Sequence, residues 1–186
     1  MNACKIVGIG ASAGGLKALT TFFQNLDNTS KGSFIVVQHL LRDHRSKLDL
    51  LLSRTTTIPV IRVNDSMELQ PNTIYVMIEG TELEVHENML QVFPRSEADM
   101  INQAVNRLFF SMAKNCRERA VGVVLSGTGS DGLEGARAIE DEGGKVLVQS
   151  PDSAQFDGMP NAVINLDHPD YIDDPADLAK KVDALL

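Results

Sequence analysis

The feature that most constrains the fold of this chain is the alternation of short apolar runs with amphipathic helical patterns. Near the start, residues 5–9 form an apolar run, residues 16–26 have the spacing of a helix with one apolar face, and residues 34–37 form a second apolar run. A strand, a helix and a strand of these lengths make a βαβ unit, whose two strands run parallel in one sheet. The start of the chain therefore predicts an α/β protein.

The same alternation continues to the other end of the chain, with one exception. Residues 82–86 and 89–93 alternate in polarity across Glu87-Asn88, as a hairpin with one wet face does. We expect one open, mainly parallel, doubly wound sheet with helices on both faces and an antiparallel hairpin at one edge, in a single domain that spans residues 1–186. The remaining patterns predict helices over residues 47–54, 100–114, 133–142 and 175–185, the last capped by Asp174, and strands over residues 60–63, 73–77, 120–125 and 145–149.

Charge and cysteine content exclude several classes of function. The 17 Lys and Arg residues and 25 Asp and Glu residues give a net charge of −8, so nucleic acid is not an expected partner. Cys4 and Cys116 are expected to be reduced thiols, since no spacing is typical of a disulfide framework or a zinc site. No apolar run approaches the roughly 18 residues of a membrane span, and no signal sequence begins the chain. We expect a soluble, cytoplasmic protein without membrane insertion.

Three predicted strand ends carry side chains that are capable of catalysis. Ser12 lies in the glycine-rich segment 10–15 after the first strand, His39 follows the second strand, and Asp131 lies in the glycine-rich segment 126–132. Ligand sites of open parallel sheets lie outside the carboxyl ends of the strands. We therefore expect Ser12, His39 and Asp131 to lie close together.

These residue types are the ones that nucleophilic acyl transfer requires. A serine hydroxyl needs an imidazole to accept its proton, and the imidazole needs a carboxylate to orient it. The oxyanion of the tetrahedral intermediate needs backbone N–H donors, for which Ala13 is the nearest candidate, and Gly14 allows a substrate to approach closely. The spacing G-x-S-x-G around Ser12 is that of a nucleophile elbow, although the order Ser, His, Asp differs from that of the α/β-hydrolases.

Dinucleotide binding is one alternative interpretation of the first glycines. Gly8-x-Gly10 after the first strand resembles the beginning of the G-x-G-x-x-G fingerprint. The next glycine, Gly14, comes one residue too late, and no acidic residue ends the second strand to bind a ribose. The pattern therefore disfavours this alternative without removing it.

Structural roles are the other alternative. Ser12 and Asp131 could each simply cap the helix that follows, and His39 could be a structural histidine at the edge of the sheet. The remaining histidines have no chemically capable neighbours in the sequence and are assigned no role; they are His44, His86 and His168.

Taken together, the three motifs resemble those of the catalytic domain of the chemotaxis protein-glutamate methylesterases, the CheB type, and most closely the branch that is fused with a receptor methyltransferase. That family has a glycine-flanked serine after strand one, Gln-His at the end of strand two and a late G-x-G-x-D-G loop, which correspond to residues 10–15, 38–39 and 127–132. The similarity extends to residues 71–76, 120–125 and 156–160.

By resemblance, Ser12 is the nucleophile, His39 the general acid and base, and Asp131 the orienting carboxylate. The implied reaction is hydrolysis of glutamate γ-methyl esters on methyl-accepting chemotaxis receptors, with deamidation of receptor glutamines as a second activity and no metal or cofactor. A receptor methyltransferase is a further partner that the resemblance allows. A receptor-binding or scaffold module of the same fold without activity remains the alternative.

Several positions depart from the family pattern. Thr128 stands where the better-known members have methionine, a change beside the site that is expected to alter substrate fit. Residues 77–82 replace a loop that in the family contains Pro, Gly and His. Residues 104–106 stand where the family has proline or serine, then an apolar residue, then aspartate. Both changes are expected to affect receptor recognition. Family members usually carry a receiver domain before the esterase domain, and none is expected in this chain.

Overall fold

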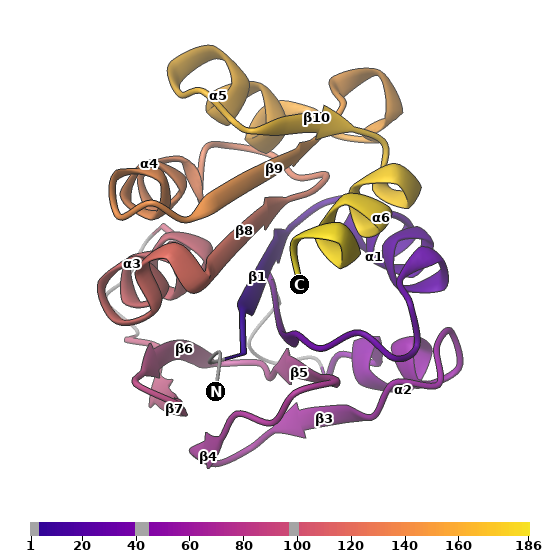
Figure 1. The fold of residues 1–186 in the computed structure, drawn as a ribbon, viewed down its shortest axis with the longest axis vertical. Helices are drawn as coiled ribbons and strands as arrows, with labels where there is room; N and C mark the ends of the chain where they lie inside the picture. The colour runs from indigo at the N-terminus through magenta and orange to yellow at the C-terminus, as the bar shows by residue number, and fades with distance from the viewer. Residues whose placement is uncertain (1–3, 40–44, 97–100) are drawn as a thin grey trace.

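The computed structural model describes residues 4–39, 45–96 and 101–186. Seven strands form its main sheet: β1 (Ile6–Ala11), β2 (Ser33–Gln38), β3 (Val60–Val63), β5 (Thr73–Met77), β8 (Ala120–Val124), β9 (Lys145–Gln149) and β10 (Tyr171–Asp173). Their order is β10-β9-β8-β1-β2-β5-β3, and each pairing is parallel (Figure 1). The chain starts in the middle of the sheet, builds one side and then crosses to the other side of β1.

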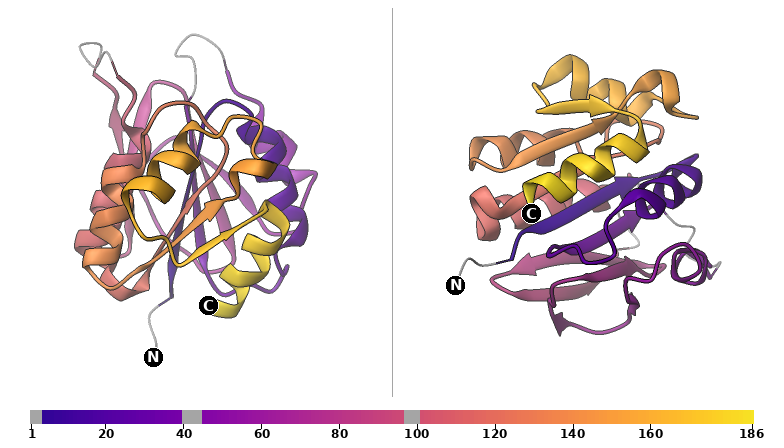
Figure 2. Two further views of the ribbon diagram at one scale, coloured as in Figure 1. Left: turned by 90° about the horizontal axis from the view of Figure 1, so that it is seen from above. Right: turned by 45° about the vertical axis from the view of Figure 1, so that its right-hand side comes forward.

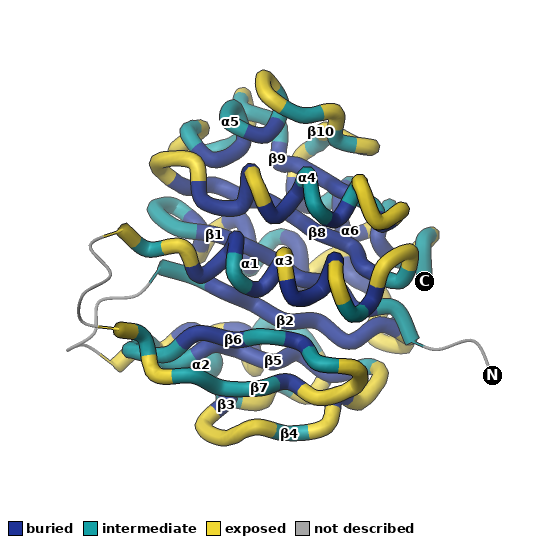
Figure 3. Tube along the Cα trace, turned by 90° about the vertical axis from the view of Figure 1, so that its left-hand side faces the viewer, coloured by how far each residue is buried: buried dark blue, intermediate teal, exposed yellow. Residues whose placement is uncertain are grey.

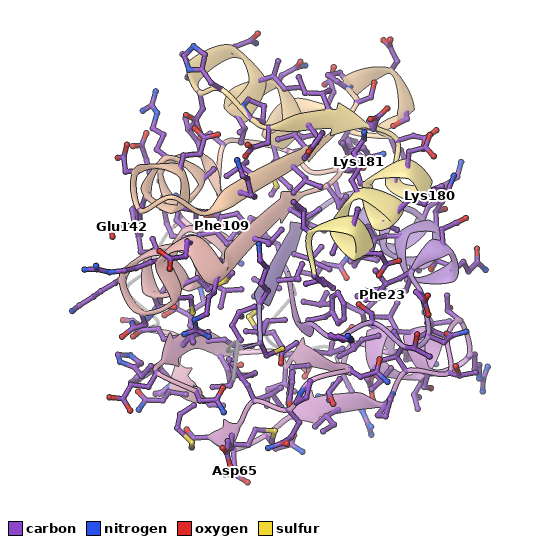
Figure 4. All side chains as sticks on the ribbon, viewed as in Figure 1. Phe23, Asp65, Phe109, Glu142, Lys180 and Lys181 are labelled. Carbon is purple, nitrogen blue, oxygen red and sulfur yellow. The ribbon has the colours of Figure 1, made fainter. Side chains whose placement is uncertain are left out.

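Helices cover both faces of this sheet (Figure 2). One face carries α1 (Gly15–Asn25), α2 (Leu48–Ser53) and α6 (Pro175–Leu185), and the other carries α3 (Ala104–Cys116), α4 (Leu133–Asp141) and α5 (Gly158–Leu166). Successive strand residues point to opposite faces, so Ile6 joins the core beneath α3 whereas Val7 joins the core beneath α1. Phe109 and Phe23 belong to these two cores on opposite sides of the sheet (Figure 4). The predicted doubly wound α/β class is confirmed.

The predicted hairpin forms, but it does not extend the parallel sheet. Its strands β6 (Thr81–His86) and β7 (Met89–Pro94) pair with the short β4 (Met67–Glu68) in a separate antiparallel sheet, in the order β4-β7-β6. This small sheet packs against α3, where the Ser111 hydroxyl accepts a hydrogen bond from the Val85 amide at 2.8 Å (Figure 3). Leu83, Val85 and Leu90 join the core beneath α3, so the dry face of the hairpin covers a helix instead of lengthening a sheet. On the face that was expected to be wet, Glu82 is only 4% exposed.

Element boundaries differ from the sequence prediction at a few places. The helix expected from residue 100 begins at Ala104, because residues 101–103 are not helical, and Met100 itself lies outside the described residues. The sequence patterns did not predict α5, β4 or β10. The closing helix α6 begins as expected, since Asp174 accepts a hydrogen bond from the Asp177 amide at 3.3 Å and Pro175 occupies the first turn.

The first two glycines of the chain lie inside β1 and face α3. A Cβ added at Gly8 would lie 2.5 Å from the Met112 sulfur, and one added at Gly10 would lie 2.4 Å from Val105 Cγ1. Both glycines therefore allow α3 to approach the sheet closely. They do not form the phosphate-binding turn that a dinucleotide fingerprint requires, which removes the sequence basis for that alternative.

Within the described ranges, no helix is long and apolar enough to cross a membrane. Among the same residues, no group of three or more His, Cys, Asp or Glu side chains is placed to hold a metal ion. Cys4 and Cys116 are both free thiols.

Candidate active site

Three loops meet where β1, β2 and β8 end. Ala11 pairs with Gln38 at the ends of β1 and β2, so Ser12 and His39 are the next residues of two adjacent strands. The His39 amide donates to the Ala11 carbonyl at 3.1 Å, and the Ser12 amide donates to the carbonyl of Ser126, just beyond β8, at 3.0 Å. The chain changes direction across the sheet between β1 and β8, and such a switch point is where open α/β sheets bind ligands.

His39 and Asp131 are joined across two of these loops. The His39 Nε2 atom lies 2.7 Å from Asp131 Oδ2, and the side chains are 20% and 4% exposed. The carboxylate accepts two further hydrogen bonds, from the Val105 amide to Oδ2 at 2.9 Å and from the Asn106 amide to Oδ1 at 2.8 Å. Asp131 is therefore a buried carboxylate with three donors, two of them at the positive end of the α3 dipole.

The alternative that Ser12 and Asp131 cap their own helices is wrong. Gly132, at φ 100°, is the N-cap of α4, and Gly14, at φ 72°, is the N-cap of α1, so neither Ser12 nor Asp131 is the N-cap of the helix that follows it. Asp131 caps a helix on another part of the chain, because its carboxylate reaches the first amides of α3. The side chain of Ser12 is free of a capping role.

Ser12 is held firmly by its backbone and half-buried. Its carbonyl accepts hydrogen bonds from the Gly15 amide at 3.0 Å and from Gln38 Nε2 at 3.4 Å. Among the contacts of the described residues, the Ser12 hydroxyl makes no hydrogen bond to His39; catalytic hydrogen bonds are often long before a substrate binds. Asp131 engages Nε2 of the imidazole, so Nδ1 is the ring nitrogen that this carboxylate leaves free.

The turn after Ser12 presents backbone donors. In the described part of the chain, no acceptor is bonded to the amides of Ala13 and Gly14. The Ser126 hydroxyl donates to the Ala13 carbonyl at 2.8 Å. This carbonyl and the Gly14 N–H belong to one trans peptide, in which C=O and N–H point in opposite directions. The Gly14 N–H therefore points away from Ser126. The Phe156 amide donates to the same hydroxyl at 3.0 Å. Ser126 therefore connects its own loop by hydrogen bonds to the loops that contain Ala13 and Phe156.

The sequence patterns do not identify Ser126 or Asn106 as site residues. Asn106 is 5% exposed, and its Oδ1 accepts hydrogen bonds from the Gly132 amide at 3.0 Å and the Gly135 amide at 2.9 Å. It is thus buried beneath the Asp131 loop and is not a surface that a receptor could contact. Thr128, by contrast, is exposed on the same loop.

The remaining histidines lie elsewhere. His86 is on β6, with Nε2 2.9 Å from Glu84, and His168 is exposed after α5. His44 lies outside the described residues. Of the histidines that the structure describes, only His39 therefore lies in the candidate site.

A cavity of about 410 Å³ lies near the site, between the starts of α1 and α6. Its lining includes Gly14 and Ser126, but none of Ser12, His39 and Asp131. The candidate site is therefore the open edge of the strands and not this cavity.

The fold and the site define a class: a doubly wound α/β protein with serine, histidine and aspartate on three loops at the switch point of its sheet. Residues 7–182 match the family model described as CheB methylesterase. The chain belongs to the CheB methylesterase family.

Individual relatives agree with this assignment. A Myxococcus xanthus protein named protein-glutamate methylesterase/protein-glutamine glutaminase 1 is 34% identical over 86% of this chain, which spans 47% of that protein. An uncharacterized 104.1 kDa protein of Rhodobacter capsulatus is 40% identical over 61% of this chain, which spans 12% of that protein. The crystal structure of the Thermotoga maritima CheB methylesterase catalytic domain has a TM-score of 0.90 and 26% identity, covering 99% of this chain and 100% of that chain. The chain spans about half the length of the curated methylesterases it matches.

Proposed function

We propose that this chain is a serine hydrolase that removes methyl groups from glutamate γ-methyl esters on chemoreceptors. The observation that carries the proposal is the 2.7 Å contact between His39 and the buried Asp131 carboxylate, at the end of the strand next to Ser12. An imidazole oriented by a carboxylate and next to a serine is what acyl transfer requires. Membership of the methylesterase family supports the same reaction.

The reaction follows from the roles of the three residues. The Ser12 oxygen attacks the ester carbonyl carbon while its proton passes to His39. Collapse of the tetrahedral intermediate breaks the bond to the methoxide, which takes the proton from the imidazolium and leaves as methanol. Water then attacks the acyl-enzyme with His39 as the base, which releases the glutamate carboxylate and restores the Ser12 hydroxyl.

Ala13 and Gly14 are the oxyanion donors of the proposal. Their amides have no acceptor among the described residues and lie at the start of α1, where the helix dipole favours negative charge. Exposed Thr128 lies on the loop that faces Ser12 and is the residue proposed to contact the substrate.

The substrate class follows from the relatives. Several of them are named protein-glutamate methylesterase/protein-glutamine glutaminase, so hydrolysis of glutamine side chains on the same receptors is included in the proposal. Methyl-accepting chemotaxis receptors are then the partners, a receptor methyltransferase acts on the same glutamates, and the reaction takes place in the cytoplasm.

Replacement of the nucleophile tests the proposal. We expect Ser12→Ala to lower methanol release from a methylated receptor by about 10⁴-fold or more, because the residual rate depends only on binding and the oxyanion donors. Ser53→Ala is the control, since Ser53 is an exposed serine on α2. Circular dichroism should show both variants folded. A Ser12→Ala protein that releases methanol at the original rate would refute the assignment.

A further inference from the structure

Two buried side chains at the starts of α3 and α4 each bind the backbone of the other helix. Asp131, just before α4, accepts hydrogen bonds from the Val105 and Asn106 amides in α3. Asn106, in α3, accepts hydrogen bonds from the Gly132 amide at 3.0 Å and the Gly135 amide at 2.9 Å. The contact is reciprocal, so neither helix start moves without breaking bonds that the other supplies.

The orientation of the Asn106 amide is set on both sides. Its Nδ2 donates to Gln103 Oε1 at 2.9 Å, while the two α4 amides require an acceptor and therefore the oxygen at the other position. Measured over whole residues, backbone included, Asn106 is 5% exposed and Asp131 is 7% exposed. Little water is available to replace a lost partner at this depth, which makes each of these bonds specific to the side chain that supplies it.

We propose that Asn106 is a positioning residue for the Asp131 carboxylate and, through it, for His39. The inference rests on the proposed function. The Gly132 amide belongs to the peptide unit that joins it to Asp131, so its bond to Asn106 fixes that peptide directly. With the backbone of the loop fixed, the carboxylate is held with Oδ2 2.7 Å from His39 Nε2.

A carboxylate at this position would differ from the amide in two ways. Aspartate at residue 106 would accept the same two hydrogen bonds from α4, but it would place a second negative charge beside Asp131 in a buried site. It would also lose the donor to Gln103. Asparagine supplies the acceptor without like-charge repulsion.

The first test compares Asn106→Leu with Asn106→Asp. Leucine has a similar size but no acceptor, and we expect kcat for p-nitrophenyl acetate to fall by about 100-fold, with KM little changed, since misplacement of a catalytic group has effects of that order. Asn106→Asp keeps the acceptor but loses the bond to Gln103 and adds a charge beside Asp131, so its kcat should lie between those of the leucine variant and the original protein. Hydrogen exchange provides a readout besides activity: the Gly132 and Gly135 amides should lose protection in the leucine variant and keep it in the aspartate variant.

Asn115→Leu is the matched control. Asn115 lies in the last turn of the same helix, where Nδ2 donates to the Val85 and Ser111 carbonyls at 2.9 Å each. Its loss loosens α3 without touching the Asp131 loop, so kcat should stay near the original value. An equal fall of kcat in both leucine variants, or an unchanged kcat in Asn106→Leu, would overturn the positioning role.

Two further variants keep the test decisive. If Asn106→Leu does not fold, Gln103→Ala is the substitute variant. It replaces an exposed residue and removes only the hydrogen bond that orients the Asn106 amide. We expect kcat to fall several-fold, and an unchanged kcat would count against the inference.

Ser12→Ala in the same assay separates the two proposals. Its loss of activity together with a normal Asn106→Leu protein refutes the positioning role alone, whereas an active Ser12→Ala protein refutes the proposed function.

Discussion

At the scale of single residues, Asp131 uses one carboxylate to satisfy three donors, which are the His39 ring and the amides of Val105 and Asn106. Only an acceptor with two oxygens can do this. An asparagine in its place has one oxygen and two N–H donors, so its NH₂ group must face at least one of those donors. The change therefore acts both on the orientation of the imidazole and on the start of α3.

We expect Asp131→Asn to lower the rate of ester hydrolysis by about 10⁴-fold, the scale seen when the orienting carboxylate of a triad becomes an amide. The free energy of unfolding should fall by about 1–3 kcal/mol, because a buried donor loses its acceptor. Stopped assays of methanol release and denaturant titration measure the two effects. Asp65→Asn neutralises an exposed carboxylate at the far end of the molecule and should change neither quantity (Figure 4); an equally slow Asp65→Asn protein would mean that net charge, and not orientation, sets the rate.

At the scale of elements, most strands and helices are predictable because their signals are local. Ser12, His39 and Asp131 could be chosen as candidates since glycine-rich segments and strand ends are visible in the sequence. The role of Ser126 could not, because its hydroxyl bonds to the carbonyl of Ala13, 113 residues away. The helix α5 was missed for a different reason: it has Pro160 in its first turn, a position where proline is tolerated but breaks the helical pattern. Similarly, β10 is three residues long and its pattern is too short to detect.

The contact between β1 and α3 leads to a prediction about two neighbouring glycines. Gly10→Ala forces its Cβ onto the stiff β-branched Val105 at the start of α3, whereas Gly8→Ala meets the flexible end of Met112. We expect Gly10→Ala to lower the free energy of unfolding by about 1–3 kcal/mol and also to slow hydrolysis, since the Val105 amide bonds to Asp131. Gly8→Ala should have the smaller effect on stability and leave hydrolysis unchanged. Urea titration and ester assays test this, and equal effects of the two substitutions would contradict it.

At the scale of the whole molecule, the chain carries a net charge of −8, and part of it gathers near the end of α4. Burial, together with the carboxylates of Asp167, Asp170 and Asp141, raises the pKa of Glu140 from its ordinary value of 4.5 to about 7. The folded state then binds a proton that the unfolded state has released between these two values. Stability is therefore lost as the pH rises from about 4.5 through 7.

We expect Glu140→Gln to remove part of this pH dependence. The variant should exceed the original protein in free energy of unfolding at pH above 7 by about 1 kcal/mol or less, because Glu140 is only partly buried and solvent screens the repulsion. Urea titrations across the pH range measure the difference, which should shrink in added salt. Glu134→Gln is the control on the same helix, as Glu134 is exposed and paired with Arg137 at 3.0 Å. A pH profile that is the same with and without Glu140 would refute the expectation.

Because β1 lies between β2 and β8, the candidate site can form only after both of these strands have been synthesised. Ser12 and His39 leave the ribosome before Asp131, which is 92 residues later than its imidazole partner. Pairing of β1 with β8 closes a long loop, which is slow compared with the local pairing of β1 with β2. A nascent chain therefore holds a serine and a histidine without the carboxylate, and the trio is complete only after the second half of the sheet has docked. If the chain has the proposed activity, recovery of hydrolysis after dilution from denaturant requires this long-range pairing of β1 with β8.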